Sequence, residues 1–159
     1  MLKKIKVTSF RNKHQEDIDV MMQEISKEFQ EGIFSPNSVS IRRVAHVIGN
    51  QFWVALDGKL VVGTLGLMRL NVEDADLKSF FVYKEYRGTQ VAKLLLQQLI
   101  QYAQSKSIRT IYIGTMEQFK AAQRFYEKNG FAKISEQDLP AAFNRNPLDT
   151  VFYKMDLQY

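Results

Sequence analysis

The chain has 159 residues, 45% hydrophobic and 25% charged, and carries a formal net charge of +5 at pH 7. This size and composition predict a single folded domain over residues 1–159, and the lack of a run of about 20 apolar residues argues against a membrane-spanning helix or a membrane partner. The absence of cysteine excludes disulfides and a cysteine nucleophile, and together with a start unlike a signal peptide it predicts a cytoplasmic protein.

The first third of the chain reads as one strand followed by two helices. Residues 4–10 alternate in polarity as a strand does, and residues 15–30 repeat apolar side chains at helical spacing. A second helix is expected to begin after Asn37 or Ser38 and to end at Gly49. Its predicted apolar face consists of Ile41, Val44, Ala45 and Ile48.

A hairpin of two strands is predicted next. The pair Asp57–Gly58 separates two apolar runs, QFWVAL and KLVVGTLGLMRL. Such a pair favours a tight turn because both residues tolerate positive φ. Gly63 and Gly66 lie inside the second run, where glycine is destabilising, so we expect a bulge or the close approach of another group there.

The rest of the chain alternates strands with helices. Strands are expected over 76–82, 110–116, 131–135 and 150–157, and helices over 91–105 and 118–129. The strand–helix–strand order implies a parallel pair with a right-handed crossover, whereas the hairpin implies antiparallel strands. We therefore expect an α/β fold: a mixed sheet of about six or seven strands, flanked on both faces by about four helices.

The segment 77–93, LKSFFVYKEYRGTQVAK, runs from a short apolar strand through a basic, glycine-containing turn directly into a helix. Unpaired N–H groups at a helix start carry partial positive charge, so this arrangement predicts a site for an anion such as a phosphate. The net positive charge is also compatible with a solvated basic surface or with nucleic-acid binding. Because the basic residues are scattered without interleaved aromatic residues, we expect no nucleic-acid partner.

Three segments resemble signatures of the GNAT superfamily of acyl-CoA N-acyltransferases. The run Arg87 to Ala92 is similar to that family's acyl-CoA loop, Gln/Arg-x-x-Gly-x-Gly/Ala, with Gln90 where glycine is usual. VYKEYRG resembles the strand end that precedes the loop, and FYEKNGF resembles a second signature further along the chain. The resemblance covers residues 51–135 well and the remainder only in its order of elements. It implies a GNAT-like fold, with acetyl-CoA (coenzyme A) as co-substrate and no metal.

The resemblance also implies roles for particular residues. The strand before the loop would bind the pantetheine arm through its main chain, and the loop would cradle the diphosphate. The cofactor-binding residues implied in this way are Phe80, Phe81, Val82, Arg87, Gly88, Thr89, Gln90, Val91, Ala92 and Lys93. Tyr126 matches the tyrosine that protonates the leaving thiolate. Phe119 stands where many relatives carry an asparagine that contacts the cofactor.

Two carboxylates are candidates for the base that removes a proton from the attacking amine. Asp76 stands near the position where some relatives have a glutamate, and Glu117 follows the next strand. Either could instead be a solvated surface group, in which case a chain of water would carry the proton. Leu139, Phe143 and Asp149, in the long segment before the last strand, are expected to help shape the acceptor pocket.

The implied function is transfer of an acetyl group from acetyl-CoA to a primary amine of a small molecule. Direct attack in a ternary complex is favoured because the chain has no cysteine to carry an acyl group. Two alternatives are acetylation of a protein amine and a non-catalytic acyl-CoA sensor. By analogy with relatives, a homodimer is a further option.

Overall fold

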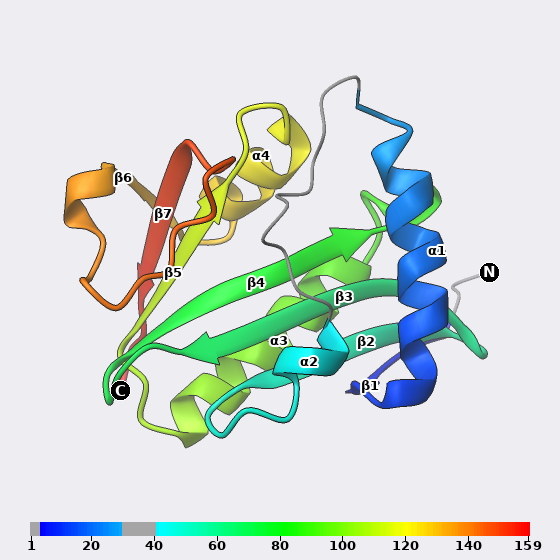
Figure 1. Cartoon of the computed structure of the whole chain (residues 1–159), viewed down its shortest axis with the longest axis horizontal. Helices are drawn as coiled ribbons and strands as arrows, with labels where there is room; N and C mark the ends of the chain where they lie inside the picture. The colour runs from blue at the N-terminus through cyan, green and yellow to red at the C-terminus, as the bar shows by residue number, and fades with distance from the viewer. Residues whose placement is uncertain (1–3, 30–40) are drawn as a thin grey trace.

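The computed structural model of the protein describes residues 4–29 and 41–159. They form one seven-stranded mixed sheet in the order β1-β2-β3-β4-β5-β7-β6, with helices on both faces (Figure 1). This confirms the α/β architecture expected from the sequence. In chain order the elements are β1 (Ile5–Ser9), α1 (Gln15–Ser26), α2 (Ile41–Val44), β2 (Gln51–Asp57), β3 (Leu60–Arg69), β4 (Asp74–Val82), α3 (Val91–Ser105), β5 (Thr110–Thr115), α4 (Lys120–Lys128), β6 (Ala132–Ile134) and β7 (Val151–Asp156).

The larger core lies between the sheet and α3. Val91, Leu95 and Leu99 form one apolar stripe of this helix and are completely buried. They pack against strand residues such as Leu65 of β3 and Ile111 of β5. Burying each such side chain contributes roughly 1.5–3 kcal/mol, so this face anchors the helix that follows the predicted anion loop.

The opposite face of the sheet is covered by α1 and α2. Ile18 of α1 and Ile41 of α2 pack with Phe52 of β2 in a smaller cluster. Further along α1, Met21 and Ile25 pack with Met116, just beyond β5. Helix α1 therefore spans the sheet from β2 to the end of β5, which brings its C-terminal turn close to the start of α4.

The structure confirms the predicted β2–β3 hairpin, but its turn lies one residue later than the predicted Asp57–Gly58 pair. Gly58 has φ +61°, and Asp57 still pairs with Leu60, so the two-residue turn is Gly58–Lys59. In β3, a Cβ atom on Gly66 would lie 2.2 Å from the ring of Phe52. Glycine at position 66 therefore leaves room for this ring beside β3, which is the close approach expected from the sequence.

The second helix differs from the prediction. Its expected start at Asn37 or Ser38 lies outside the described residues. Helix α2 ends at Val44 instead of Gly49, and the Asn50 side chain donates to the Val44 carbonyl at 3.0 Å. Ile48 is fully exposed, at 101% of its reference surface, so it does not belong to the apolar face. A side chain that caps an early carbonyl ended the helix before the apolar pattern did.

The parallel strands β4 and β5 pair over only part of their length. The pairing runs from Asp74 opposite Thr110 to Leu77 opposite Ile113, and beyond this point the two strands diverge (Figure 1). In the unpaired part, Ser79 has φ +55°, and the register of β3 with β4 shifts at the same place. A β-bulge therefore re-aims the end of β4 where it leaves β5.

The main chain at the end of β4 has one edge without a strand partner. Tyr83 N donates to Val62 O at 3.0 Å, and Gly63 lies opposite Val82. Because hydrogen-bonded and non-bonded pairs alternate in antiparallel strands, the N–H of Val82 points away from β3, toward the side where β5 diverges. A ligand with acceptor groups could pair with this edge as another strand would.

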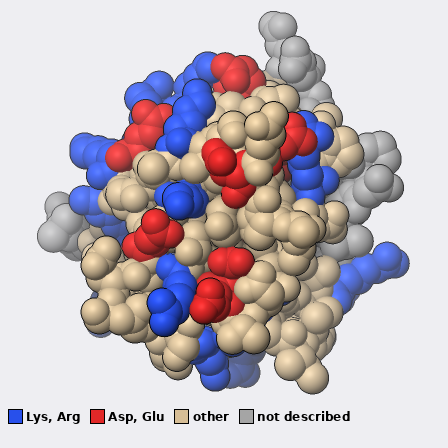
Figure 2. Space-filling view, turned by 90° about the vertical axis from the view of Figure 1, so that its left-hand side faces the viewer, with Lys and Arg blue, Asp and Glu red and all other residues tan. Residues whose placement is uncertain are grey.

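Charged side chains are interspersed on the side of the molecule that carries β6 and β7. Figure 2 shows lysine and arginine mixed with aspartate and glutamate over this face, without a broad area of one sign. This face does not offer the continuous basic stripe that nucleic-acid binding uses. Within residues 4–29 and 41–159, no helix is long and apolar enough to cross a lipid bilayer.

Candidate active site

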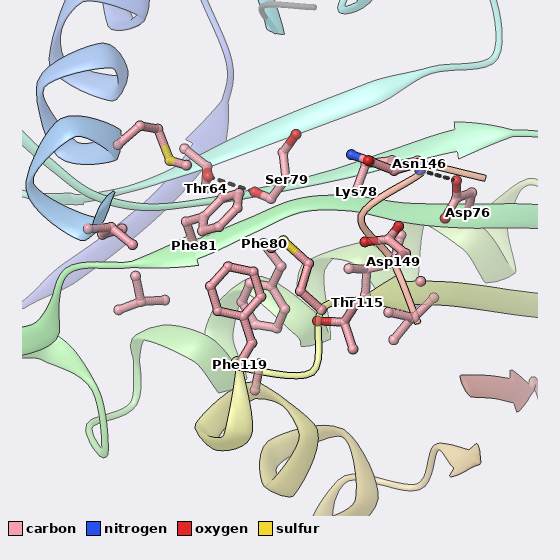
Figure 3. Close-up of a pocket in the computed structure, with 18 of the residues that line it drawn as sticks. Thr64, Asp76, Lys78, Ser79, Phe80, Phe81, Thr115, Phe119, Asn146 and Asp149 are labelled. Atoms are coloured by element: carbon pink, nitrogen blue, oxygen red, sulfur yellow. Dashed lines mark hydrogen bonds and ion pairs between the residues drawn. The ribbon is translucent and has the colours of Figure 1, made fainter. Parts of the chain in front are cut away.

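A groove of about 1410 Å³ opens where β4 and β5 diverge. At one end it is lined by Arg87, Gly88 and Ala92, and at the other by Asp76 and Asp149. The close-up in Figure 3 shows the part of the groove where side chains from β4, β5 and the loop before β7 face one another. The structure therefore joins the predicted anion loop and one of the two candidate bases in a single cavity.

The loop before α3 has the backbone expected of an anion cradle. Gly88 has φ +75°, and a Cβ atom built on it would meet nothing within 4 Å. Gln90 has helical dihedrals (φ −76°, ψ −9°) and an exposed side chain, so its position does not require the glycine that is usual in the family. Helix α3 begins at Val91, and the N–H groups of its first turn have no acceptor within the helix.

Arg87 links this loop to the end of α1. Its guanidinium forms two hydrogen bonds with the carboxylate of Glu28, at 2.5 and 2.8 Å, and its Nε donates to the Val82 carbonyl at 3.0 Å. A bidentate pair of this kind is geometrically specific. The charge of Arg87 is thus partly met by Glu28, and the loop is positioned relative to α1.

Tyr126 of α4 lies in a cluster of aromatic rings at the groove. It is 3% exposed, and its ring centroid lies 6.0 Å from that of Phe80 and 5.6 Å from those of Phe131 and Tyr153. Burial, followed by the charge of Asp149, raises the pKa of the Tyr126 hydroxyl. The phenol therefore stays protonated near neutral pH and can act as a proton donor.

Asp76 is buried, which corrects the alternative that it is a surface carboxylate. It is 1% exposed; its Oδ2 lies 3.0 Å from Lys78 Nζ, and its Oδ1 has no hydrogen-bond partner among the described residues. Burial raises the pKa of Asp76 to about 7, although Lys78 acts in the opposite direction. A carboxylate with this pKa can accept a proton at neutral pH.

Glu117, the other candidate base, lies outside the groove. Its side chain is 69% exposed and pairs with Lys120 at 2.7 Å, and that hydrogen bond lowers its pKa. Glu117 is therefore a solvated surface carboxylate, which was the alternative interpretation of its position in the sequence. The two candidates differ because Asp76 lies within a central strand, whereas Glu117 follows the end of β5.

Asp76 and Tyr126 reach the groove from opposite faces of the sheet. Leu77 packs in the core on the α3 side together with Tyr126. Successive side chains of a strand alternate between faces, so Asp76 and Lys78 point to the side of α1 and α2. The cavity at the divergence of the strands connects the two faces, and a molecule lying in it would meet a carboxyl group on one side and a phenol on the other.

Comparison with known proteins identifies the family. Residues 18–131 match the model of the acetyltransferase (GNAT) family. The chain belongs to this family. Its fold agrees with that of a GNAT-family acetyltransferase from Staphylococcus aureus, which is 32% identical with a TM-score of 0.91, over 98% of this chain and 100% of the other.

Two further relatives show how far the GNAT likeness extends. N-acetylaspartate synthetase from Danio rerio is 30% identical over 111 residues, which is 67% of this chain and 39% of the synthetase. The PaiA N-acetyltransferase from Thermoplasma acidophilum in complex with coenzyme A is 18% identical, with a TM-score of 0.76 over 97% of this chain and 99% of the other. At this level of identity, the likeness shows a shared fold alone. The chain spans less than half the length of the synthetase and of the other curated relatives most similar to it.

Phe119 gives this GNAT domain an aromatic contact where many members have an asparagine. It immediately precedes α4 and packs edge-on against Phe29, with ring centroids 4.9 Å apart. Its ring also lies 6.1 Å from that of Phe81 at the end of β4. These contacts connect the end of α1 with α4 along the wall of the groove (Figure 3).

The loop before β7 contributes to the groove differently from the prediction. Asp149 lines the groove, but Leu139 and Phe143 are not among the described residues that do so. Phe143 is buried beneath Lys78, whose Nζ lies 5.3 Å from the ring centroid. Apolar residues in a loop follow no period, so their orientation could not be read from the sequence. Lys78 was not among the predicted site residues, although its spacing of two from Asp76 places both on one face of the strand.

Proposed function

We propose that the protein transfers an acetyl group from acetyl-CoA to a primary amine of a small molecule, by direct attack in a ternary complex. The observation that carries this proposal is the groove at the divergence of β4 and β5, which Asp76 and Tyr126 enter from opposite faces. Membership of the GNAT family supports acetyl-CoA as co-substrate. So does the coenzyme A bound by the Thermoplasma acidophilum relative.

The loop and the end of β4 fit the two parts of coenzyme A. The diphosphate would lie against the main chain of the loop and the first turn of α3, where N–H groups and the helix dipole favour an anion. The pantetheine arm would pair with the free edge of β4, through the main chain of Phe80 and Val82. Phe81 lies opposite Thr64 of β3 and would contribute its ring instead. The diphosphate cradle proposed here consists of Arg87, Gly88, Thr89, Gln90, Val91, Ala92 and Lys93.

The side chains at the divergence supply the proton transfers. The amine nitrogen attacks the thioester carbonyl carbon, and the carbon–sulfur bond breaks. Asp76 accepts the proton that the amine loses, and Tyr126 donates a proton to the departing sulfur. The N–H of Val82 faces the same gap and can stabilise the charge that develops on the carbonyl oxygen.

Thiol release from acetyl-CoA, measured with a colorimetric thiol reagent against a panel of primary amines, tests this function. Tyr126→Phe removes the donor hydroxyl and should lower kcat about 10²–10⁴-fold, the usual contribution of a general acid. Acetyl-CoA affinity, measured by calorimetry, should stay within about twofold because the ring remains. Absence of any affinity for acetyl-CoA or coenzyme A would overturn the proposal. Binding without thiol release for any amine would instead favour an acyl-CoA sensor.

The small size of the acceptor is supported by the cavity and by one relative. The acceptor end of the groove lies between α1 and the loop before β7, and the name of the Danio rerio relative specifies acetylation of aspartate. A protein amine would have to reach Asp76, which is 1% exposed.

We further propose a cytoplasmic location, supported by the absence of cysteine. A homodimer is tested by light scattering on the purified protein.

A further inference from the structure

Two carboxylates at the acceptor end of the groove have oxygen atoms that accept no hydrogen bond from the described residues. Asp149 is 7% exposed, and its carboxylate accepts no hydrogen bond from the described residues. Its Oδ2 lies 2.8 Å from the place that a Cβ on Gly114 would occupy, so it packs against β5 where the strands diverge. Figure 3 shows this carboxylate pointing into the cavity near Thr115. The second unmet acceptor is Oδ1 of Asp76.

The cationic side chains on the same side already have partners. Arg69 donates to three main-chain carbonyls, at 3.1, 2.6 and 3.1 Å. Lys78 pairs with Asp76 at 3.0 Å, and Arg145 pairs with Glu136 at 3.1 Å. Among the described residues of the site, Lys78 and Arg145 are thus paired with other carboxylates, and the carboxylate of Asp149 is left without a hydrogen-bond donor, whereas Arg69 is met by neutral carbonyls. Buried charged groups without partners are costly, so a bound cation would be stabilised.

The walls that continue from the two carboxylates toward α1 and α2 carry several apolar side chains beside the polar Gln15, Asp19 and Gln23 of α1. Met68 lies directly opposite Asp76 in the β3–β4 register and lines the groove. Beyond it, Phe52 lines the groove together with Ile18 of α1 and Ile41 of α2. A ligand held at the carboxylates would therefore extend along aliphatic and aromatic side chains, which favour an alkyl or aryl body.

We propose that the acceptor is a primary amine on an alkyl or aryl body without a carboxylate beside the amine, and that Asp149 binds it in its ammonium form. This inference rests on the proposed function and narrows it. The ammonium would donate hydrogen bonds to Asp149 and to Asp76, lose one proton to Asp76, and then attack as the neutral amine. An α-carboxylate would lie next to two carboxylates, and the lysine beside them, Lys78, is already paired with Asp76, so α-amino acids are disfavoured.

Matched substrate pairs that differ only in the α-carboxylate test this directly on the unmodified protein. Phenethylamine is compared with phenylalanine, and 1,4-diaminobutane with ornithine, by thiol release at saturating acetyl-CoA. We expect kcat/KM for the better amine to exceed that of its amino acid by about 100-fold or more, the scale of a like-charge contact in a desolvated site. Equal rates, or faster release with the amino acids, would overturn the inference while leaving the proposed function intact. No release with any of the four or with the wider panel of primary amines, although acetyl-CoA binds, would overturn the proposed function itself.

Replacement of Asp149 by asparagine separates ammonium binding from packing. Asp149→Asn keeps the volume against Gly114 and should raise KM for phenethylamine at least tenfold, with kcat changed less than about threefold and acetyl-CoA affinity unchanged. The control is Asp156→Asn, the same change at an exposed carboxylate of β7 outside the groove. If Asp149→Asn shows no thermal unfolding transition and is therefore not folded, the matched substrate pairs still test the inference on the unmodified protein. An unchanged KM in a folded variant would refute the role of Asp149.

Discussion

Replacing Asp76 by asparagine should make the protein slower and, at the same time, more stable. The substitution removes a proton acceptor but keeps the shape of the side chain. Asp76 is 1% exposed, and burial raises its pKa to about 7 although Lys78 Nζ lies 3.0 Å away. The ionised carboxylate of Asp76 is needed for activity but lowers the stability of the folded state. Its removal should therefore change activity and stability in opposite directions.

The stability change can be worked out from this pKa. Asp76 titrates near 3.8 in the unfolded chain and near 7 in the folded protein, so the folded state holds the extra proton between these values. Stability therefore falls as the pH rises through this window. The difference of about three pKa units corresponds to about 4 kcal/mol at pH 8. Asparagine stays neutral and avoids this cost, so Asp76→Asn should raise Tm by several degrees at pH 8 and by progressively less toward pH 5.

The activity change follows the same titration. In the unmodified protein, kcat/KM should rise with pH around a midpoint near 7 as Asp76 loses its proton, and Asp76→Asn should lose about 10²–10⁴-fold together with this inflection. Thiol release with a fixed amine and thermal melts are measured in one buffer series from pH 5 to 8.5. Glu117→Gln is the matched control, because Glu117 is an exposed carboxylate paired with Lys120. For Asp76→Asn, activity within threefold of the unmodified protein would refute the reasoning. So would a Tm at pH 8 below that of the unmodified protein.

Two further substitutions test the loop and the sheet. Ala92→Glu places a carboxylate in the first turn of α3, beside the proposed diphosphate site, and should weaken acetyl-CoA binding at least tenfold, as measured by calorimetry. The control, Gln97→Glu on the exposed side of the same helix, should leave the affinity unchanged. Equal affinities of the two variants for acetyl-CoA would mean that the diphosphate site has been misplaced. Gly66→Ala puts a Cβ 2.2 Å from the Phe52 ring and should lower the free energy of unfolding, measured by urea denaturation, by about 1–3 kcal/mol. A variant as stable as the unmodified protein would show that the ring can move aside without cost.

Local sequence signals predicted those parts of the molecule whose conformation depends on neighbours along the chain. The apolar stripe of α3, the turn at Gly58 and the left-handed end of α4 at Gly130 all occur where the pattern placed them. Each reflects a short-range constraint, either helical periodicity or a positive φ that glycine tolerates. The loop at Arg87 was recognisable for the same reason, because its residues are contiguous.

The acceptor end of the site could not be read in this way. Asp76 reads as a polar residue at the beginning of a strand, and only the contacts with β3, β5 and the loop before β7 bury it. Asp149 lies 73 positions further along the chain, so nothing local connects the two. The end of α2 was misjudged because the Asn50 side chain caps Val44, which the apolar pattern does not encode.

The amino-acid sequence alone determined the order of strands and helices, the parallel crossover and the glycine-containing turn before α3, because each arises from spacing and backbone preference within a few residues. The tertiary structure decided which carboxylate is buried, how the cations at the acceptor end are partnered, and from which faces of the sheet Tyr126 and Asp76 approach the groove. These properties depend on desolvation and on pairing between distant segments. Both exist only once β4 and β5 have diverged and the loop before β7 has closed over them.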